Sequence, residues 1–281
     1  MSAVSTVVVT LATRSRAAHL AVQREAVRRH LPGFRHLVVL LDDPGWTPWP
    51  GAWTVDASSA GPVELARARN TGGDAAVSAG AEHLVFLDVD CLPGPDLGKH
   101  YSAALRTRPD TVACGPVTYL DQAPASGYDL DALDDLTDPH PARPAPPDGL
   151  IRAATSDEYV LFWSLSFAVT ASTWSAIRSR IGGFHERYRG YGGEDTDLGL
   201  ALRESGVPMA WVGGAHAYHQ HHPVSDPPVE HVDAILANGA VFRERWGFWP
   251  MVGWLEEFET LGLVRRDAEG VWTRSPGRTS S

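Results

Sequence analysis

The feature that most constrains the fold is a regular alternation of short apolar runs with longer helical segments early in the chain. Four runs have the β-branched composition and the length of buried strands, at 6–12, 36–41, 53–57 and 83–87. Helical segments are expected at 17–30 and 63–79. This strand–helix–strand order predicts an α/β fold in which a parallel sheet has helices on both of its faces.

Polar side chains follow the predicted strands at their carboxyl ends. In open α/β sheets, ligands bind in the crevice beyond these ends. We therefore expect one crevice to collect the following residues: Thr13, Arg14, Asp42, Asp43, Asp88 and Asp90.

Charge and hydropathy exclude several partners. The chain has 24 Lys and Arg against 34 Asp and Glu, a net charge of −10, so it lacks the basic footprint of a nucleic-acid binder. Apolar runs such as 7–12 and 37–41 fall far short of the ~18–20 residues of a transmembrane segment. The N-terminus shows no secretion signal, so we expect a cytoplasmic protein whose Cys91 and Cys114 are reduced.

The first acidic cluster is the pair Asp88 and Asp90, which follows the fourth predicted strand. Strand alternation is expected to place both side chains on the same side of the pleat. Two carboxylates at such a short distance repel each other unless a cation lies between them. Carboxylate oxygens are ligands that suit Mg²⁺ or Mn²⁺. A strand-end turn with solvated acids is the alternative for so short a pattern.

A second cluster follows a glycine-rich turn at 190–193. Glu194 and Asp195 fall in the first turn of a predicted helix, where the helix dipole favours acids. A carboxylate held there can also accept a proton from a hydroxyl group. Further along, His219, His221 and His222 offer imidazoles of the kind that bind transition metals, although surface histidines in a turn would give the same pattern.

Two stretches depart from the α/β pattern. The segment 121–157 is rich in prolines and acids and is expected to be one long loop, either functional or disordered. From residue 229 the sequence is helical and rich in tryptophan. The expected organisation is a first domain over 1–225 and a C-terminal helical extension over 226–281 that packs on it.

Four segments, taken together and in order, resemble the nucleotide-sugar glycosyltransferases of the GT-A fold: VFLDVDCLPGPDL, GPVTYL, GGFHERYRGYGGEDTDLGLAL and GGAHAYHQHHP. The GGED segment is similar to that of inverting β-1,4-galactosyltransferases and of bacterial chondroitin-polymerase-type family 2 enzymes. The likeness extends over about 4–223. It implies a Rossmann-like, mixed and mostly parallel sheet flanked by helices.

The resemblance also implies a metal site and a set of nucleotide contacts. Asp90 would bind the divalent cation, Mn²⁺ or Mg²⁺, and Asp88 would face the ribose or a water on the metal. His219 would complete the metal site, with His221 or His222 as substitutes. The implied nucleotide-binding positions are Thr10, Arg14, Asp42, Arg69 and Asn70, together with Asp88.

On the acceptor side, the resemblance implies that Asp195 is the catalytic base and that Glu194 orients the acceptor hydroxyl. Tyr191 stands where the galactosyltransferases carry a tryptophan beside the sugar, which leaves the donor and acceptor preference open. The implied reaction is metal-dependent, inverting transfer of a sugar from a nucleotide donor, with UDP as the expected carrier, to a hydroxyl acceptor. One base and one displacement invert the anomeric centre, whereas retaining glycosidases need a second carboxylate as nucleophile.

Three other functions fit parts of the sequence. A haloacid-dehalogenase-like phosphatase has a similar acidic motif, but it expects that motif near the first strand and a lysine on a later segment, and the one lysine here is Lys99. A sugar nucleotidyltransferase would show a glycine-rich basic loop after the first strand. A non-catalytic nucleotide-sugar-binding module is the remaining alternative, and donor hydrolysis or transfer would separate it from an enzyme.

Overall fold

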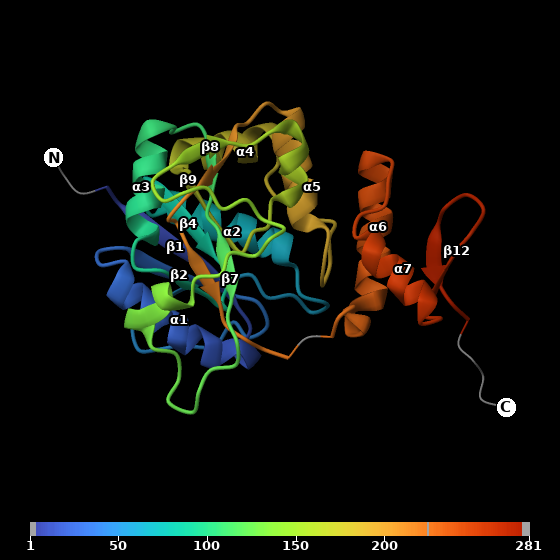
Figure 1. The fold of residues 1–281 in the computed structure, drawn as a ribbon, viewed down its shortest axis with the longest axis horizontal. Coiled ribbons are helices and arrows are strands. Elements are labelled where there is room, and N and C mark those ends of the chain that lie inside the picture. The colour runs from blue at the N-terminus through green and yellow to red at the C-terminus, as the bar shows by residue number, and fades with distance from the viewer. Residues whose placement is uncertain (1–3, 224, 277–281) are drawn as a thin grey trace.

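The central element of the computed structural model is an eight-stranded sheet with the order β3-β2-β1-β4-β9-β6-β10-β8 (Figure 1). The structure describes residues 4–223 and 225–276. The strands β1 to β4 are parallel to one another, as predicted. Their bounds are Thr6–Ala12 for β1, Arg35–Leu40 for β2, Trp53–Asp56 for β3 and His83–Leu87 for β4.

The other half of the sheet mixes directions. The strand β9 runs antiparallel to β4 and to β6, and β8 runs antiparallel to β10. The bounds are Val112–Cys114 for β6, Ile151–Ala153 for β8, Ser166–Thr170 for β9 and Met209–Val212 for β10. The expected mixed, mostly parallel sheet is therefore confirmed.

Helices cover both faces of this sheet, because successive strand residues point to opposite sides. Val7 and Val9 pack with α2 and α4 on one face, whereas Val8 packs with α1 and α3 on the other. The helices are α1 (Ala17–His30), α2 (Leu65–Ser78), α3 (Leu97–Thr107), α4 (Ala171–Ile181) and α5 (Glu194–Glu204). Among the described residues, no helix combines the length and the apolar character required to cross a membrane.

A second, three-stranded sheet with the order β5-β11-β7 positions the site. Its strands are β5 (Cys91–Pro93), β7 (Val117–Tyr119) and β11 (Ala217–His219). In the antiparallel pair of β5 and β11, His219 lies opposite Cys91. The residue before Cys91 is Asp90, so this register brings two predicted metal ligands together although they are far apart in the sequence.

The segment 121–157 is not one irregular loop, which corrects that expectation. It contains a 3-10 stretch, η2 (Leu130–Leu136), and the edge strand β8, which pairs with β10 of the main sheet. A further 3-10 stretch, η3 (Ser156–Leu161), follows. The strand β8 has only three residues and follows several prolines, so its sequence shows no alternating pattern long enough to predict a strand.

The C-terminal segment lies beside α5 (Figure 1). It comprises η4 (Val229–His231), α6 (Val232–Trp246), α7 (Val252–Thr260) and a hairpin of β12 (Val264–Arg266) and β13 (Trp272–Arg274). Ile235, Leu255, Phe258 and Trp272 form a small core of its own. The segment thus has a β-hairpin besides the expected helices, and the domain boundary at residue 225 stays a prediction.

Candidate active site

The acidic pair lies in a turn between β4 and β5, not on a strand. The strand β4 ends at Leu87, and the Cys91 amide donates a hydrogen bond to the Asp88 carbonyl at 2.8 Å. Because strand alternation stops at Leu87, the two carboxylates have different partners. Asp88 pairs with Arg69, and Asp90 faces two histidines.

Asp90, His219 and His222 form a cluster whose ligand atoms all lie within 4.8 Å of one another. The Nε2 atoms of His219 and His222 are each 3.4 Å from a carboxylate oxygen of Asp90. The Asp90 Oδ1 atom is buried and accepts no hydrogen bond. One carboxylate and two imidazoles, with an oxygen left unpaired, fit a divalent transition ion. The sequence left His221 and His222 open, and the structure brings His222 into the cluster.

The electrostatics of Asp90 agree with a ligand that stays ionised. Burial opposes ionisation of its carboxyl, but the contacts with His219 and His222 outweigh burial and hold the pKa of Asp90 well below its usual range. The His219 ring is itself held by Tyr119, which stacks on it with centroids 4.5 Å apart and 20° between the planes. The cluster therefore presents an anionic oxygen at neutral pH.

Arg69 joins the acidic turn to the second acidic cluster. Its guanidinium lies 3.1 Å from an oxygen of Asp88 and 3.1 Å from Oε1 of Glu194, and the residue is 4 % exposed. Burial raises the pKa of Asp88, with Arg69 acting against it and Asp90 and Asp195 adding to it. Removing one partner of a buried ion pair costs about 3–5 kcal/mol, so Arg69 is expected to be essential to the local structure.

Glu194 and Asp195 begin α5, as predicted. Gly192 and Gly193 precede them with φ of 96° and 93°, a left-handed backbone that glycine adopts without strain. Asp195 is partly exposed, and its Oδ2 accepts hydrogen bonds of 3.2 Å from the amide and the hydroxyl of Ser164. These bonds fix one oxygen of Asp195. Sequence reasoning missed Ser164, because nothing local to it indicates a partner on α5.

The pKa of Glu194 is raised, first by burial and then by the charge of Asp195, with Arg69 acting against both. Between pH 4.5, the ordinary pKa of the group, and its raised pKa of about 8, Glu194 holds a proton in the folded protein that it has lost in the unfolded chain. Wild-type stability therefore falls as pH rises through this window. Glutamine binds no such proton, so Glu194→Gln is expected to gain stability relative to the wild type between about pH 5 and pH 8.

Thermal unfolding of both proteins across this pH range measures the effect. The matched control is Glu204→Gln, which changes an exposed acid at the other end of α5. Its melting curve should follow that of the wild type at every pH. Parallel pH profiles for the wild type and Glu194→Gln would show that Glu194 titrates as an ordinary carboxyl.

The predicted nucleotide positions divide into two groups. At the carboxyl ends of β1 and β2, the Arg14 amide donates to Asp42 at 2.9 Å and its guanidinium lies 2.6 Å from Asp43. These exposed groups remain available to a ligand. Arg69 lies at the centre of the site, as described above.

Asn70 and Thr10 hold the scaffold instead. The Asn70 side chain donates to the Phe184 carbonyl and accepts from the Phe184 amide, at 2.8 and 2.9 Å. Thr10 is 0 % exposed and donates to Gln23 Oε1 at 3.0 Å. Gln23 in turn donates to the carbonyls of Asp88 and Cys91, at 2.6 and 2.9 Å. The structure thus places Thr10 behind the acidic turn rather than in the crevice.

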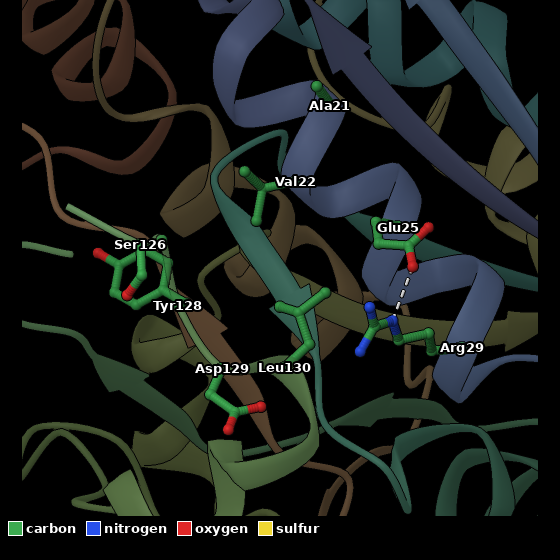
Figure 2. Close-up of a pocket in the computed structure, with 9 residues that line it drawn as sticks. Ala21, Val22, Glu25, Arg29, Ser126, Tyr128, Asp129 and Leu130 are labelled. Carbon is green, nitrogen blue, oxygen red and sulfur yellow. Dashed lines mark hydrogen bonds and ion pairs between the residues drawn. The ribbon is translucent and has the colours of Figure 1, made fainter. Parts of the chain in front are cut away.

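A groove of about 480 Å³ lies elsewhere, between α1 and residues 126–130 (Figure 2). Its wall includes Val22, Tyr128 and Leu130 and the ion pair of Glu25 with Arg29, whose atoms are 2.7 Å apart. None of the described residues that line it belongs to the predicted site. We assign this groove no part in the chemistry.

The sheet order, the acidic turn facing a histidine pair and the glycine-rich start of α5 define a protein of the GT-A glycosyltransferase class. Residues 56–221 match the family described as "Glycosyltransferase like family 2". This match covers more than half of the chain, and the chain belongs to that family. Membership in this family argues against the phosphatase alternative. The phosphatase also expects a lysine on a later segment, and the one lysine, Lys99, is an exposed residue of α3 that contacts Asp96.

Solved structures confirm the fold. The chain is similar to GalNAc-T7, crystallised with UDP, GalNAc and Mn²⁺, with a TM-score of 0.54 and 13 % identity over 92 % of this chain and 57 % of that one. It is also similar to residues 1–349 of S. aureus TarS in complex with UDP-GlcNAc, with a TM-score of 0.56 and 9 % identity over 90 % of this chain and 76 % of that one.

Sequence comparison also gives a short match to curated proteins. A segment of 51 residues, 18 % of this chain, is 39 % identical to validoxylamine A glucosyltransferases of Streptomyces hygroscopicus subsp. jinggangensis (strain 5008) and subsp. limoneus. The match covers only 11 % and 10 % of those two proteins. The matched segment of this chain therefore spans about a tenth of the length of these relatives.

Proposed function

We propose that this protein is an enzyme that transfers a sugar from a nucleotide donor, with UDP as the expected carrier, to an acceptor hydroxyl. The transfer would depend on a divalent cation and would invert the configuration of the anomeric carbon. The observation that carries the proposal is the Arg69 bridge. It ties the turn that holds Asp90 to the start of α5, which holds Asp195. A metal cluster and a candidate base thus flank one continuous hydrogen-bonded network of Asp88, Arg69 and Glu194.

The donor side is supported by the neighbours and by the exposed groups beyond β1 and β2. Structures of similar fold were solved with UDP or UDP-GlcNAc. In this chain Arg14, Asp42 and Asp43 lie at the carboxyl ends of these strands, where α/β sheets bind ligands. They would contact the nucleotide, while Asp88, held by Arg69, would face the ribose.

Asp90, His219 and His222 would hold the cation. When bound, a divalent cation stabilises the negative charge that develops on the departing diphosphate. Imidazole ligands suit Mn²⁺ better than Mg²⁺, which prefers an all-oxygen shell. We therefore expect Mn²⁺ to support activity better than Mg²⁺.

On the acceptor side, Asp195 would take the proton of the attacking hydroxyl. The Ser164 hydrogen bonds to Oδ2 fix the orientation of the carboxylate and leave its other oxygen for the acceptor. The acceptor oxygen then bonds to the anomeric carbon as the bond from that carbon to the diphosphate breaks. A single displacement on the face opposite the leaving group inverts the anomeric centre.

Because UDP is the proposed carrier and the similar curated proteins are named validoxylamine A glucosyltransferases, UDP-glucose is the first donor to test and validoxylamine A the first acceptor. A panel of nucleotide sugars extends the test to other donors.

We expect UDP and one or more UDP-sugars to raise the melting temperature in the presence of Mn²⁺ and to lose this effect in EDTA. A ligand at 100 times its dissociation constant stabilises the folded state by about 2.7 kcal/mol, which is several degrees for a chain of this size. Differential scanning fluorimetry with UDP-, GDP- and CMP-sugars measures it. Equal shifts with and without EDTA would contradict the metal dependence, and UDP release into solution would separate an enzyme from a binding module.

A further inference from the structure

The C-terminal segment reaches the glycine-rich turn through one buried side chain, Asn238 on α6. Asn238 is 2 % exposed. Its Oδ1 accepts a hydrogen bond from the Arg189 amide at 3.0 Å. Its Nδ2 lies 2.9 Å from the carbonyl of Arg189, 3.0 Å from that of Tyr191 and 2.9 Å from that of Gly192. The two hydrogens of one amide group are therefore shared among three carbonyls.

The turn needs an external partner because its backbone is unusually free. Gly190, Gly192 and Gly193 all have positive φ, and glycine populates many other conformations at low cost. The turn leads directly into Glu194 and Asp195. A shift of the turn would therefore move the candidate base and the Tyr191 side chain together.

Two further contacts tie the same region to the C-terminal segment. The ring of Tyr191, which is 39 % exposed, stacks on His231 of η4 with centroids 4.6 Å apart and 18° between the planes. On α5, the buried Asp197 accepts hydrogen bonds from Arg245 at 2.6 Å and from Trp246 at 2.7 Å. The segment thus holds both the turn and the helix that follows it.

We infer that Asn238 is a positioning residue that sets the acceptor side of the site, and that the C-terminal segment is part of the catalytic machinery rather than a separate appendage. This inference rests on the proposed transferase function. The donor and metal side is held by other elements, since Asp90 directly precedes β5 and His219 ends β11, the strand that pairs with β5. Loss of the Asn238 contacts should therefore affect turnover and leave metal and UDP binding intact.

Asn238→Asp tests this with almost no change in side-chain volume. The carboxylate would face three carbonyls and donate to none of them. Asn238→Ser is the second variant, which removes the amide without adding charge. For both we expect kcat for UDP release from UDP-glucose to fall by about 10–100-fold with little change in the KM for UDP-glucose. Binding of Mn²⁺ and UDP, measured by calorimetry, should stay within about twofold of the wild type.

Hydrogen exchange gives a readout that is independent of turnover. Amides of 189–193 should exchange at least about tenfold faster in both variants. The control is Leu105→Val on α3, which weakens a buried part of the main core and lies outside the C-terminal segment. It should lower the melting temperature and leave kcat and the exchange of 189–193 unchanged.

Unchanged exchange at 189–193, or equal losses of kcat and of Mn²⁺–UDP affinity, would overturn the inference. A wild-type protein that releases UDP from no sugar nucleotide would contradict the proposed function, and the exchange experiment would still decide whether Asn238 holds the turn.

Discussion

Asp195→Asn is expected to abolish sugar transfer while the protein still binds Mn²⁺ and UDP. Asparagine keeps the shape of the side chain, and its amide oxygen can still accept the hydrogen bonds from Ser164. It has no basic oxygen to take the proton of the acceptor hydroxyl. General-base catalysis contributes about 10²–10⁴-fold, so the loss in kcat should fall in this range.

UDP release from the preferred donor with its acceptor measures turnover, and calorimetry with Mn²⁺ and UDP measures binding. Glu204→Gln, at the exposed end of the same helix, is the matched control and should behave as the wild type. If Asp195→Asn kept its turnover, the base would have to be sought elsewhere, and Glu194 would be the first candidate.

Asp90→Ala is expected to lose cation and donor affinity together. The substitution removes the one carboxylate of the cluster and leaves the two imidazoles. We expect Mn²⁺ to bind at least about 100-fold more weakly, a change of about 2.8 kcal/mol in binding free energy. UDP should weaken in parallel when Mn²⁺ is present. His222→Ala should give a smaller loss, because Asp90 and His219 remain.

The signal of free Mn²⁺ in electron paramagnetic resonance measures the first loss, and calorimetry with UDP measures the second. Asp96→Ala is the control, since Asp96 is an exposed acid close in sequence that contacts Lys99. Undiminished Mn²⁺ affinity in Asp90→Ala would remove Asp90 from the metal site. A loss of Mn²⁺ affinity without any change in UDP affinity would separate the cation from donor binding.

The parts of the structure that the sequence predicted are those in which local pattern and final environment agree. The strands β1 and β4 are mostly apolar and are buried along their whole length, so composition alone marks them. The start of α5 combines glycines with acids. The glycines allow the left-handed backbone before the helix, and the acids are stabilised by the helix dipole, so both can be read from the local sequence. For the same reason the acidic turn and the helix that carries the candidate base could be placed at one edge of the sheet.

The parts that the sequence could not predict depend on partners distant in the chain. Asp88 faces Arg69 rather than a cation because β4 ends at Leu87 and because α2 places Arg69 beside it. Neither cause can be read from the acidic motif alone. Thr10 looks like a crevice residue, but Gln23 on α1 takes its hydroxyl. The contact of Ser164 with Asp195 joins two separate elements, and the choice of His222 over His221 depends on how the chain turns after β11.

The small sheet of β5, β7 and β11 has a consequence for metal exchange. The Gln220 amide donates to the Asp90 carbonyl at 2.7 Å, directly beside the pairing of His219 with Cys91. Backbone bonds therefore hold the ligands in register whether or not an ion is present. An incoming ion would order little additional chain, so its affinity is not diminished by a large entropy penalty. In the proposed mechanism, an ion bound there would be able to leave with the spent nucleotide and be replaced at the next turnover while the scaffold around it stays intact.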